Sequence, residues 1–235
     1  MPSTQSLHTT NHLLDALPSK DREQLLANCE PIELVSSEVL YRAGELITHV
    51  YFPTGSFVSL VTPIDGRANL EVGLIGNEGM LGISLMLDVD VAPFYSLVQG
   101  PGSALRMAAP LFYRELEQNP ALQRELKRYL YVSIKQLAQT AACTRFHVLE
   151  ARLARWLLMT QDRAHSEHLH VTHVFLAYVL GVRRVGITKA ANSLQQQKLI
   201  KYQRGDITIL DRAGLEAVSC RCYQTDKETY ERILG

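Results

Sequence analysis

One apolar stripe in the middle of the chain constrains the fold more than any other feature. Its members recur at steps of 4, 4, 4, 3 and 4 residues, and no glycine or proline interrupts residues 122–141. This spacing puts them on one face of a single α-helix. Such a helix at the edge of a domain cannot bury its whole face within one chain, so we expect a dimer seam, with packing on the chain's own strands as the alternative. The stripe comprises Leu122, Leu126, Leu130, Ile134, Leu137 and Ala141.

The residues before the stripe show the sequence pattern of a β-domain. Between residues 31 and 107, short runs rich in Val, Ile, Tyr and Phe alternate with segments rich in Gly, Pro, Asp and Asn. Many short strands at tight spacing are typical of an antiparallel barrel or sandwich. We therefore expect a jelly-roll-like antiparallel β-barrel over residues 1–120, followed by a dimerisation helix and hinge over residues 121–145. The runs are IELV, HVYF, SFVSLV, NLEVGLI, FYSLVQ and SALRM.

The residues after the stripe suggest a helix-turn-helix followed by a hairpin. Thr172 is suited to cap a helix over residues 173–180, and Gly181 to end it in the left-handed conformation. A second helix begins near Arg183, and two helices joined by a short glycine-containing turn form the helix-turn-helix pattern. The stretch KYQRGDITIL then offers two short strands with Gly-Asp in the turn. We expect residues 146–235 to form a winged helix-turn-helix domain, in a protein of the α+β class.

The 235 residues carry a net charge of zero, but the charges are unevenly distributed. Residues 1–120 hold 6 Lys and Arg against 14 Asp and Glu, whereas residues 121–235 hold 18 against 10. Residues 171–205 hold six basic residues and no acid. This asymmetry indicates an acidic domain joined to a domain that binds a polyanion. The simpler alternative is that the basic residues form only a solvated surface without a polyanionic partner.

Several classes of protein do not fit the sequence. It contains no run long and apolar enough for a membrane span and no secretory signal, so we expect a cytoplasmic protein without a membrane partner. Four cysteines are too few for a disulfide scaffold of this size. A nucleophile elbow, a phosphate-binding loop, a zinc-protease motif and a dinucleotide fingerprint are all missing, so we expect no enzymatic activity.

The second helix of the expected pair has one apolar face and one face without acids. Its apolar residues recur at i, i+3, i+4 and i+7 from Ile187, and the opposite face holds no carboxylate, which phosphates would repel. Arg184 and Lys189 can donate to guanine, and an exposed Val185 can contact a thymine methyl group. Residues at helix starts and in the wing are placed for phosphate contacts. The expected DNA-binding residues are Thr172, Arg183, Arg184, Val185, Thr188, Lys189, Asn192 and Arg204.

The expected order of elements resembles that of the Crp/Fnr family of bacterial transcription regulators: a strand-rich domain, a long helix, a second helix and a winged helix-turn-helix. The likeness is most specific in EARLARWLLMTQDR and from Leu180 to Glu216, and weaker in LYRAGE and IGNEGMLG. It implies a homodimer that binds double-stranded DNA at a two-fold operator and gates transcription, with RNA polymerase as a partner. The family's Arg, Glu and Arg base-reading positions match Arg184, Val185 and Lys189, so the missing Glu argues against the family's common target sequence.

The resemblance also implies a ligand pocket in the β-domain, where the chain departs from the family pattern. Members that bind cyclic AMP hold its phosphate with a buried Arg followed by Ser or Thr, and Phe94 and Tyr95 stand at the matching positions. No Arg or Lys occurs between residues 68 and 105, so a buried anion would lack a partner. We expect no cyclic-nucleotide binding and no cofactor, and a pocket that is filled by Phe94 or takes an uncharged effector. The expected pocket residues are Gly76, Glu78, Gly79, Phe94 and Tyr95.

Four histidines lie close together in the stretch HSEHLHVTH. Imidazoles at this density can bind a transition metal. Their spacing straddles a loop and a helix start, however, so they need not converge, and we expect a polar linker and no metal site. The histidines are His165, His168, His170 and His173.

Other sensing mechanisms remain open at this point. Cys220 and Cys222 could form a redox switch, although the simpler expectation is that they are solvent-exposed or packed and have no functional role. A redox- or haem-dependent sensor using Cys29, His12 or His49 is an alternative within the same architecture. A dimeric scaffold whose basic helix binds a protein is an alternative of another class, and it would lack the steep salt dependence of DNA binding.

Overall fold

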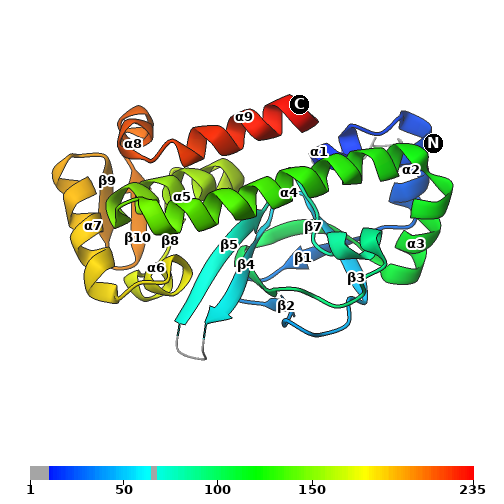
Figure 1. The fold of residues 1–235 in the computed structure, drawn as a ribbon, viewed down its shortest axis with the longest axis horizontal. Helices are drawn as coiled ribbons and strands as arrows, with labels where there is room; N and C mark the ends of the chain where they lie inside the picture. The colour runs from blue at the N-terminus through cyan, green and yellow to red at the C-terminus, as the bar shows by residue number, and fades with distance from the viewer. Residues whose placement is uncertain (1–10, 65–67) are drawn as a thin grey trace, which may run out of the picture.

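The computed structural model describes residues 11–64 and 68–235, in which one long helix joins two large apolar cores (Figure 1). This helix, α4 (Pro120–Phe146), runs along most of the molecule, with the β-domain against its first part and a smaller C-terminal domain at its other end. The last helix, α9 (Cys222–Leu234), lies alongside α4. Within the described ranges, no helix combines the length and apolar character that a membrane span requires.

The seven described strands of the β-domain form two antiparallel sheets, with strand orders β1-β7-β3 and β2-β6-β4-β5. Side chains of both sheets, among them Phe52, Val58 and Met107, share one core. The expected antiparallel β-domain is confirmed, although its described strands pair as two sheets and not as one closed barrel. The strands are β1 (Glu30–Leu34), β2 (Val39–Tyr41), β3 (His49–Pro53), β4 (Phe57–Ile64), β5 (Ala68–Ile75), β6 (Tyr95–Gly100) and β7 (Gly102–Ala108).

The six apolar runs of the sequence all lie in strands, and only the short β2 was missed. Three residues are too few to show an alternating pattern, so no local signal marks this strand. The chain passes from one sheet to the other between β6 and β7, at Gly102, whose φ is +144°. A Cβ at this position would lie 2.5 Å from the carbonyl oxygen of Gly55, so the crossing requires glycine.

The helices of the N-terminal half pack around the sheets. Asn119 caps α4 by accepting the amide of Leu122 at 2.9 Å, and Pro120 occupies the first turn, where its missing N–H costs nothing. The single long helix that the stripe predicted across residues 122–141 is therefore confirmed, and it extends through the whole of residues 121–145, where a helix and a hinge were expected. The other helices here are α1 (His12–Asp15), α2 (Ser19–Ala27), the 3₁₀ helix η1 (Ile83–Leu87) and α3 (Ala109–Gln118).

The apolar stripe of α4 divides into two parts. Leu122 and Leu126 are 1% and 0% exposed and belong to the core of the β-domain, so the prediction that they form a dimer seam is wrong. The β-domain covers the first turns of the helix and leaves the later ones open. Ile134 is 55% exposed, Ala141 is exposed, and Leu130 and Leu137 are half-buried.

The C-terminal domain has the order helix, strand, helix, helix, hairpin, helix, helix. Its three described strands form one antiparallel sheet, with β10 between β8 and β9. The expected winged helix-turn-helix gains a third strand from the histidine-rich stretch. Its elements are α5 (Leu149–Ala164), β8 (His168–His170), α6 (His173–Leu180), α7 (Arg184–Gln196), β9 (Ile200–Gln203), β10 (Asp206–Ile209), α8 (Arg212–Val218) and α9.

The wing turn is made by Arg204 and Gly205, not by the Gly-Asp pair that the sequence suggested. Both residues have positive φ, +51° and +92°. Two central residues of this kind give the turn whose twist matches the flanking strands of a hairpin. Asp206 is the first residue of β10 and pairs with Gln203 of β9.

The four histidines do not converge on one point. His168 Nδ1 lies 3.1 Å from the Thr208 hydroxyl, and His170 Nδ1 lies 2.7 Å from the Asp206 carboxylate. His173 instead stacks on Tyr202, with 4.1 Å between ring centroids. The structure therefore favours a structural role in and beside the wing over a shared metal.

A buried carboxyl group joins the two domains. Glu71 of β5 is 8% exposed and accepts hydrogen bonds from the Ser59 hydroxyl (2.6 Å) and from Nε1 of Trp156 in α5 (2.9 Å). Burial raises the pKa of Glu71 to about 7, and the two donors only partly offset this effect. The Trp156 indole, which is buried in the core of the C-terminal domain, thus also makes a polar contact between the domains.

Replacing Glu71 by Gln should make the fold more stable above neutral pH. The folded state of the parent holds the Glu71 proton more tightly than the unfolded state does. Its free energy of unfolding therefore falls as pH rises from about 4.5 to about 7 and then levels off. Glu71→Gln lacks this loss, so we expect it to exceed the parent by about 1–3 kcal/mol near pH 8 and to match it near pH 5. Urea unfolding at both pH values measures the difference, and a difference that does not change with pH would contradict the assignment.

Candidate nucleic-acid interface

Two residues that the sequence marked as helix ends bound the first helix of the helix-turn-helix, α6. Thr172 caps α6, its hydroxyl oxygen accepting the Phe175 amide at 3.1 Å. Gly181 ends α6 with φ +64°, in the left-handed region, and α7 starts three residues later. The apolar stripe of α7 is then buried against α5 and α6. Its buried members are Ile187, Ala190, Ala191 and Leu194.

The opposite face of α7 is open to solvent. Arg184, Lys189 and Asn192 are exposed, and Val185 is 66% exposed, which is unusual for an aliphatic side chain that has no partner to contact. Arg183, the residue that precedes the helix, is exposed as well. These side chains come from successive turns of one helix, so they form a single acid-free surface.

Thr188 is placed differently from the other expected DNA-binding residues. Its hydroxyl donates to the carbonyl oxygen of Arg184 (3.2 Å) and lies 3.1 Å from His173 Nδ1. Burial, with help from the nearby Arg184 charge, lowers the pKa of His173, so the ring is neutral at pH 7 and stays stacked on Tyr202. Thr188 therefore holds α7 against α6 instead of presenting a free donor.

The hairpin of β9 and β10, which forms the wing, lies next to the acid-free face of α7. Arg204 is exposed in its turn, and Lys201 is exposed on β9. The Gln195 side chain of α7 accepts the Tyr202 amide at 2.8 Å, which ties the wing to the helix. Asp206, the first acid after the basic stretch, places its carboxylate 2.7 Å from His170 Nδ1.

Gly186 allows a close helix contact that the sequence did not reveal. A Cβ at this position would lie 2.9 Å from a methyl carbon of Leu149, so glycine lets α7 pack closely on α5. Gly186 is half-buried, and its role is the close contact between the two helices. No local pattern distinguishes such a contact, because it depends on which residue of α5 meets the helix.

A cavity of about 310 Å³ lies between the β-domain and α4. Among the described residues, those lining it include no charged side chain, and Leu130, Ile134 and Leu137 of α4 form part of its wall. Ser84 also lines it, with a buried hydroxyl that has no partner among the described residues. The lining therefore suits an uncharged, mostly apolar molecule that carries a hydrogen-bonding group.

Of the five expected pocket residues, Phe94 alone lines this cavity. Gly76 donates its amide to the Glu78 carboxylate at 3.1 Å, and a Cβ at Gly79 would collide with the ring of Tyr129. Tyr95 begins β6 and pairs with Val61. These four residues therefore do not line this cavity, although Ile75, Met80, Leu81 and Gly82 of the IGNEGMLG stretch do.

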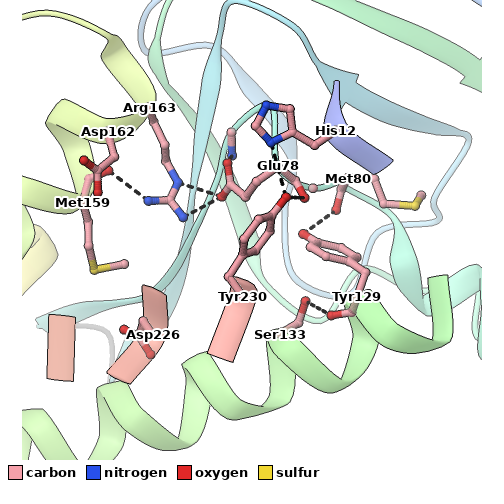
Figure 2. Close-up of polar contacts among 12 residues, drawn as sticks. His12, Glu78, Met80, Tyr129, Ser133, Met159, Asp162, Arg163, Asp226 and Tyr230 are labelled. Carbon is pink, nitrogen blue, oxygen red and sulfur yellow. Dashed lines mark hydrogen bonds and ion pairs between the residues drawn. The ribbon is translucent and has the colours of Figure 1, made fainter. Parts of the chain in front are cut away.

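Glu78 instead links the two domains. Figure 2 shows the Arg163 guanidinium of α5 reaching the Glu78 carboxylate, with Nη2 and Nε at 2.5 and 2.9 Å from Oε1. Tyr129 of α4 donates its hydroxyl to the Met80 carbonyl oxygen beside this pair (3.2 Å). Tyr230 of α9 approaches the Glu78 carbonyl oxygen at 3.5 Å. Around Glu78, the stretch expected to cradle an effector thus contacts the three helices α4, α5 and α9.

Comparisons with known proteins agree with this architecture. Residues 151–218 match the Crp-like helix-turn-helix domain, and no curated protein matches the chain significantly. A regulator of the Crp/Fnr family from Eubacterium rectale superimposes with a TM-score of 0.69 at 16% identity, over 88% of this chain and 96% of that one. FixK2 from Bradyrhizobium japonicum also gives 0.69, at 12% identity, over 82% and 98% of the two chains.

The c-di-GMP responsive global regulator CLP from Xanthomonas campestris gives a TM-score of 0.67 at 17% identity, over 82% of this chain and 99% of that one. At such identities the likeness shows the fold, and the match at residues 151–218 shows a Crp-like helix-turn-helix domain. The chain therefore has the fold of these Crp/Fnr-family structures over most of its length, and its residues 151–218 form a Crp-like helix-turn-helix domain.

Proposed function

We propose that the protein is a cytoplasmic transcription regulator that binds a palindromic operator as a homodimer and acts together with RNA polymerase. The acid-free outer face of α7 carries this proposal. Arg184, Val185 and Lys189 are exposed on its first turns, the part of a recognition helix that enters the major groove. Arg183, Asn192, Thr172 and Arg204 surround them and are placed to contact phosphates.

The later turns of α4 supply the dimer seam of this proposal. Tyr131 and Ile134 are 48% and 55% exposed, and Ala138 and Ala141 continue the same face at steps of 4 and 3 residues. A face of this period suits antiparallel or parallel pairing with an identical helix. Leu130 and Leu137 border both this face and the cavity. A ligand in the cavity would therefore act directly on the seam.

Cyclic nucleotides are expected not to bind in the cavity. A cyclic phosphate placed there would have no cationic partner among the lining residues, and burial of an unpaired charge is very costly. Calorimetry with cyclic AMP and cyclic GMP at millimolar concentration should show no saturable heat. Operator affinity should be the same with and without either nucleotide. Binding at micromolar affinity, or a large gain in operator affinity, would refute this expectation.

Selection of bound DNA from a random pool, with and without cell extract, tests the proposed function. We expect a palindrome with half-sites centred about 34 Å apart, because two recognition helices of a dimer meet successive turns of the groove. Affinity should fall steeply between about 50 and 200 mM salt, since phosphate contacts release counterions. Recovery of no preferred sequence, with a partner protein bound equally well at both salt concentrations, would indicate a scaffold instead.

A further inference from the structure

Three cysteines and a histidine that are far apart in the sequence meet where α4 ends. Cys143 lies in the last turn of α4 and His147 is its C-terminal cap, one helical turn further along. Cys220 lies between α8 and α9, and Cys222 is the first residue of α9. The three sulfur atoms and one imidazole nitrogen all lie within 4.8 Å of one another. The pair at 220 and 222 is therefore part of a larger group, which the sequence could not show.

The distances within this cluster suit tetrahedral coordination. Cys143 Sγ lies 3.4 Å from Cys220 Sγ, and Cys222 Sγ lies 3.5 Å from His147 Nδ1. With zinc–sulfur and zinc–nitrogen bonds of about 2.3 and 2.0 Å, the edges of a tetrahedral site are about 3.5–3.8 Å. Small shifts of side chains would therefore bring all four atoms to one metal. A disulfide would use only two of the three sulfur atoms, so it would not account for the third thiol and the imidazole that lie beside them.

The surroundings supply the polar support that such a site needs. The Gln139 side-chain amide donates to Cys222 Sγ at 2.9 Å, as residues behind metal ligands commonly do. Arg152 and Arg155 of α5 interact electrostatically with Cys143 and Cys220, so they can balance three thiolates around a divalent ion. The three cysteines are buried whereas His147 is exposed, which leaves the imidazole on the side from which an ion can enter.

We propose that Cys143, His147, Cys220 and Cys222 form a zinc-binding site at the junction of α4 and the DNA-binding domain. Binding of Zn²⁺ to three thiols and one neutral imidazole releases three protons and leaves a site of net charge −1. The ion would fasten the α8–α9 connection to the end of α4. In the proposed DNA-binding dimer, on which this role rests, the metal would fix the orientation of the helix-turn-helix relative to the dimer seam.

Metal titration of the full-length chain, reduced and stripped of metal, tests the site. We expect one Zn²⁺ per chain in competition with a chromophoric chelator, and thiolate-to-metal charge-transfer absorption when Co²⁺ replaces zinc. His147→Gln and Cys222→Ser should each weaken zinc binding by at least about 100-fold, because each removes a direct ligand. Cys29→Ser is the matched control, since it removes a thiol of the β-domain and should bind as the parent does.

The outcomes separate this site from its alternatives. His147 is exposed, so its variant should fold even if Cys222→Ser does not. Zinc binding that is unchanged in His147→Gln and Cys222→Ser would overturn the proposal. So would a reduced chain that binds no metal, including one that forms only a Cys143–Cys220 disulfide on oxidation. Operator binding is measured separately, with zinc and with chelator. A chain that binds zinc but no DNA refutes the proposed function alone, and a chain that binds DNA but no zinc refutes the metal site alone.

Discussion

Alanine at both Arg184 and Lys189 is expected to lower operator affinity by about 2–6 kcal/mol, or roughly 30- to 25,000-fold. Each side chain is exposed on the acid-free face of α7 and each can donate to a guanine in the major groove. The loss of a base contact costs about 1–3 kcal/mol, and two separate contacts should add. The loss should be concentrated at particular base pairs. Fluorescence anisotropy on the selected operator and on single-base variants measures both effects.

Matched variants distinguish base reading from a simple loss of charge. Arg114 and Lys127 are exposed on α3 and α4, away from α7, so changing both to alanine removes the same charge and should leave operator affinity near that of the parent. Arg204→Ala in the wing should weaken all DNA sequences alike and reduce the salt slope by about one unit. If the double variant of α7 bound operator as well as the parent does, α7 would not be the recognition helix.

Glutamate at Ile134 is expected to convert the dimer to monomer and, with it, to abolish tight operator binding. In the proposed seam the two Ile134 side chains, or their neighbours, face each other across the paired α4 helices. Burial of an unpaired carboxylate there should cost about 3–5 kcal/mol of dimer stability, which raises the dissociation constant of the dimer by a hundredfold or more. Sedimentation velocity and operator titration should change together, because one half-site supplies only half of the contacts.

The structure makes this a clean test of the interface. Ile134 is 55% exposed in the single chain, so the substitution should leave the monomer folded. Val35 is 65% exposed in the loop between β1 and β2, and Val35→Glu makes the same chemical change away from α4. This control should remain dimeric. An Ile134→Glu protein that sediments as a dimer with normal affinity would place the interface elsewhere.

The sequence predicted a helix, a helix end or a strand correctly wherever the signal for it lay within a few residues. The step of the apolar stripe predicted one unbroken helix across residues 122–141, and α4 contains all of them, because a helix repeats regardless of what it packs against. Thr172 and Gly181 marked the ends of α6 correctly, since a cap and a left-handed stop depend on the backbone nearby. The same is true of the apolar stripe on α7 and of six of the seven described strands in the β-domain.

Tertiary structure decided everything that depends on which surfaces meet. Leu122 and Ile134 belong to one stripe, yet the β-domain buries the first and leaves the second exposed. The carboxylate of Glu78, a residue expected to line the effector pocket, binds Arg163, which lies 85 positions later in the chain. Charge pairs of this kind form only when the fold brings two elements together, so no local pattern encodes them.

The sequence by itself determined that the chain contains a strand-rich half, a long helix and a helix-turn-helix with an acid-free outer face. These features follow from periodicity, caps and charge, which act over one or two helical turns. Only the tertiary structure brought Cys143 and His147 together with Cys220 and Cys222, across more than 70 intervening residues. The packing of α9 along α4 creates that cluster. Such a contact is set by the sum of many side-chain interactions and not by the residues that it joins.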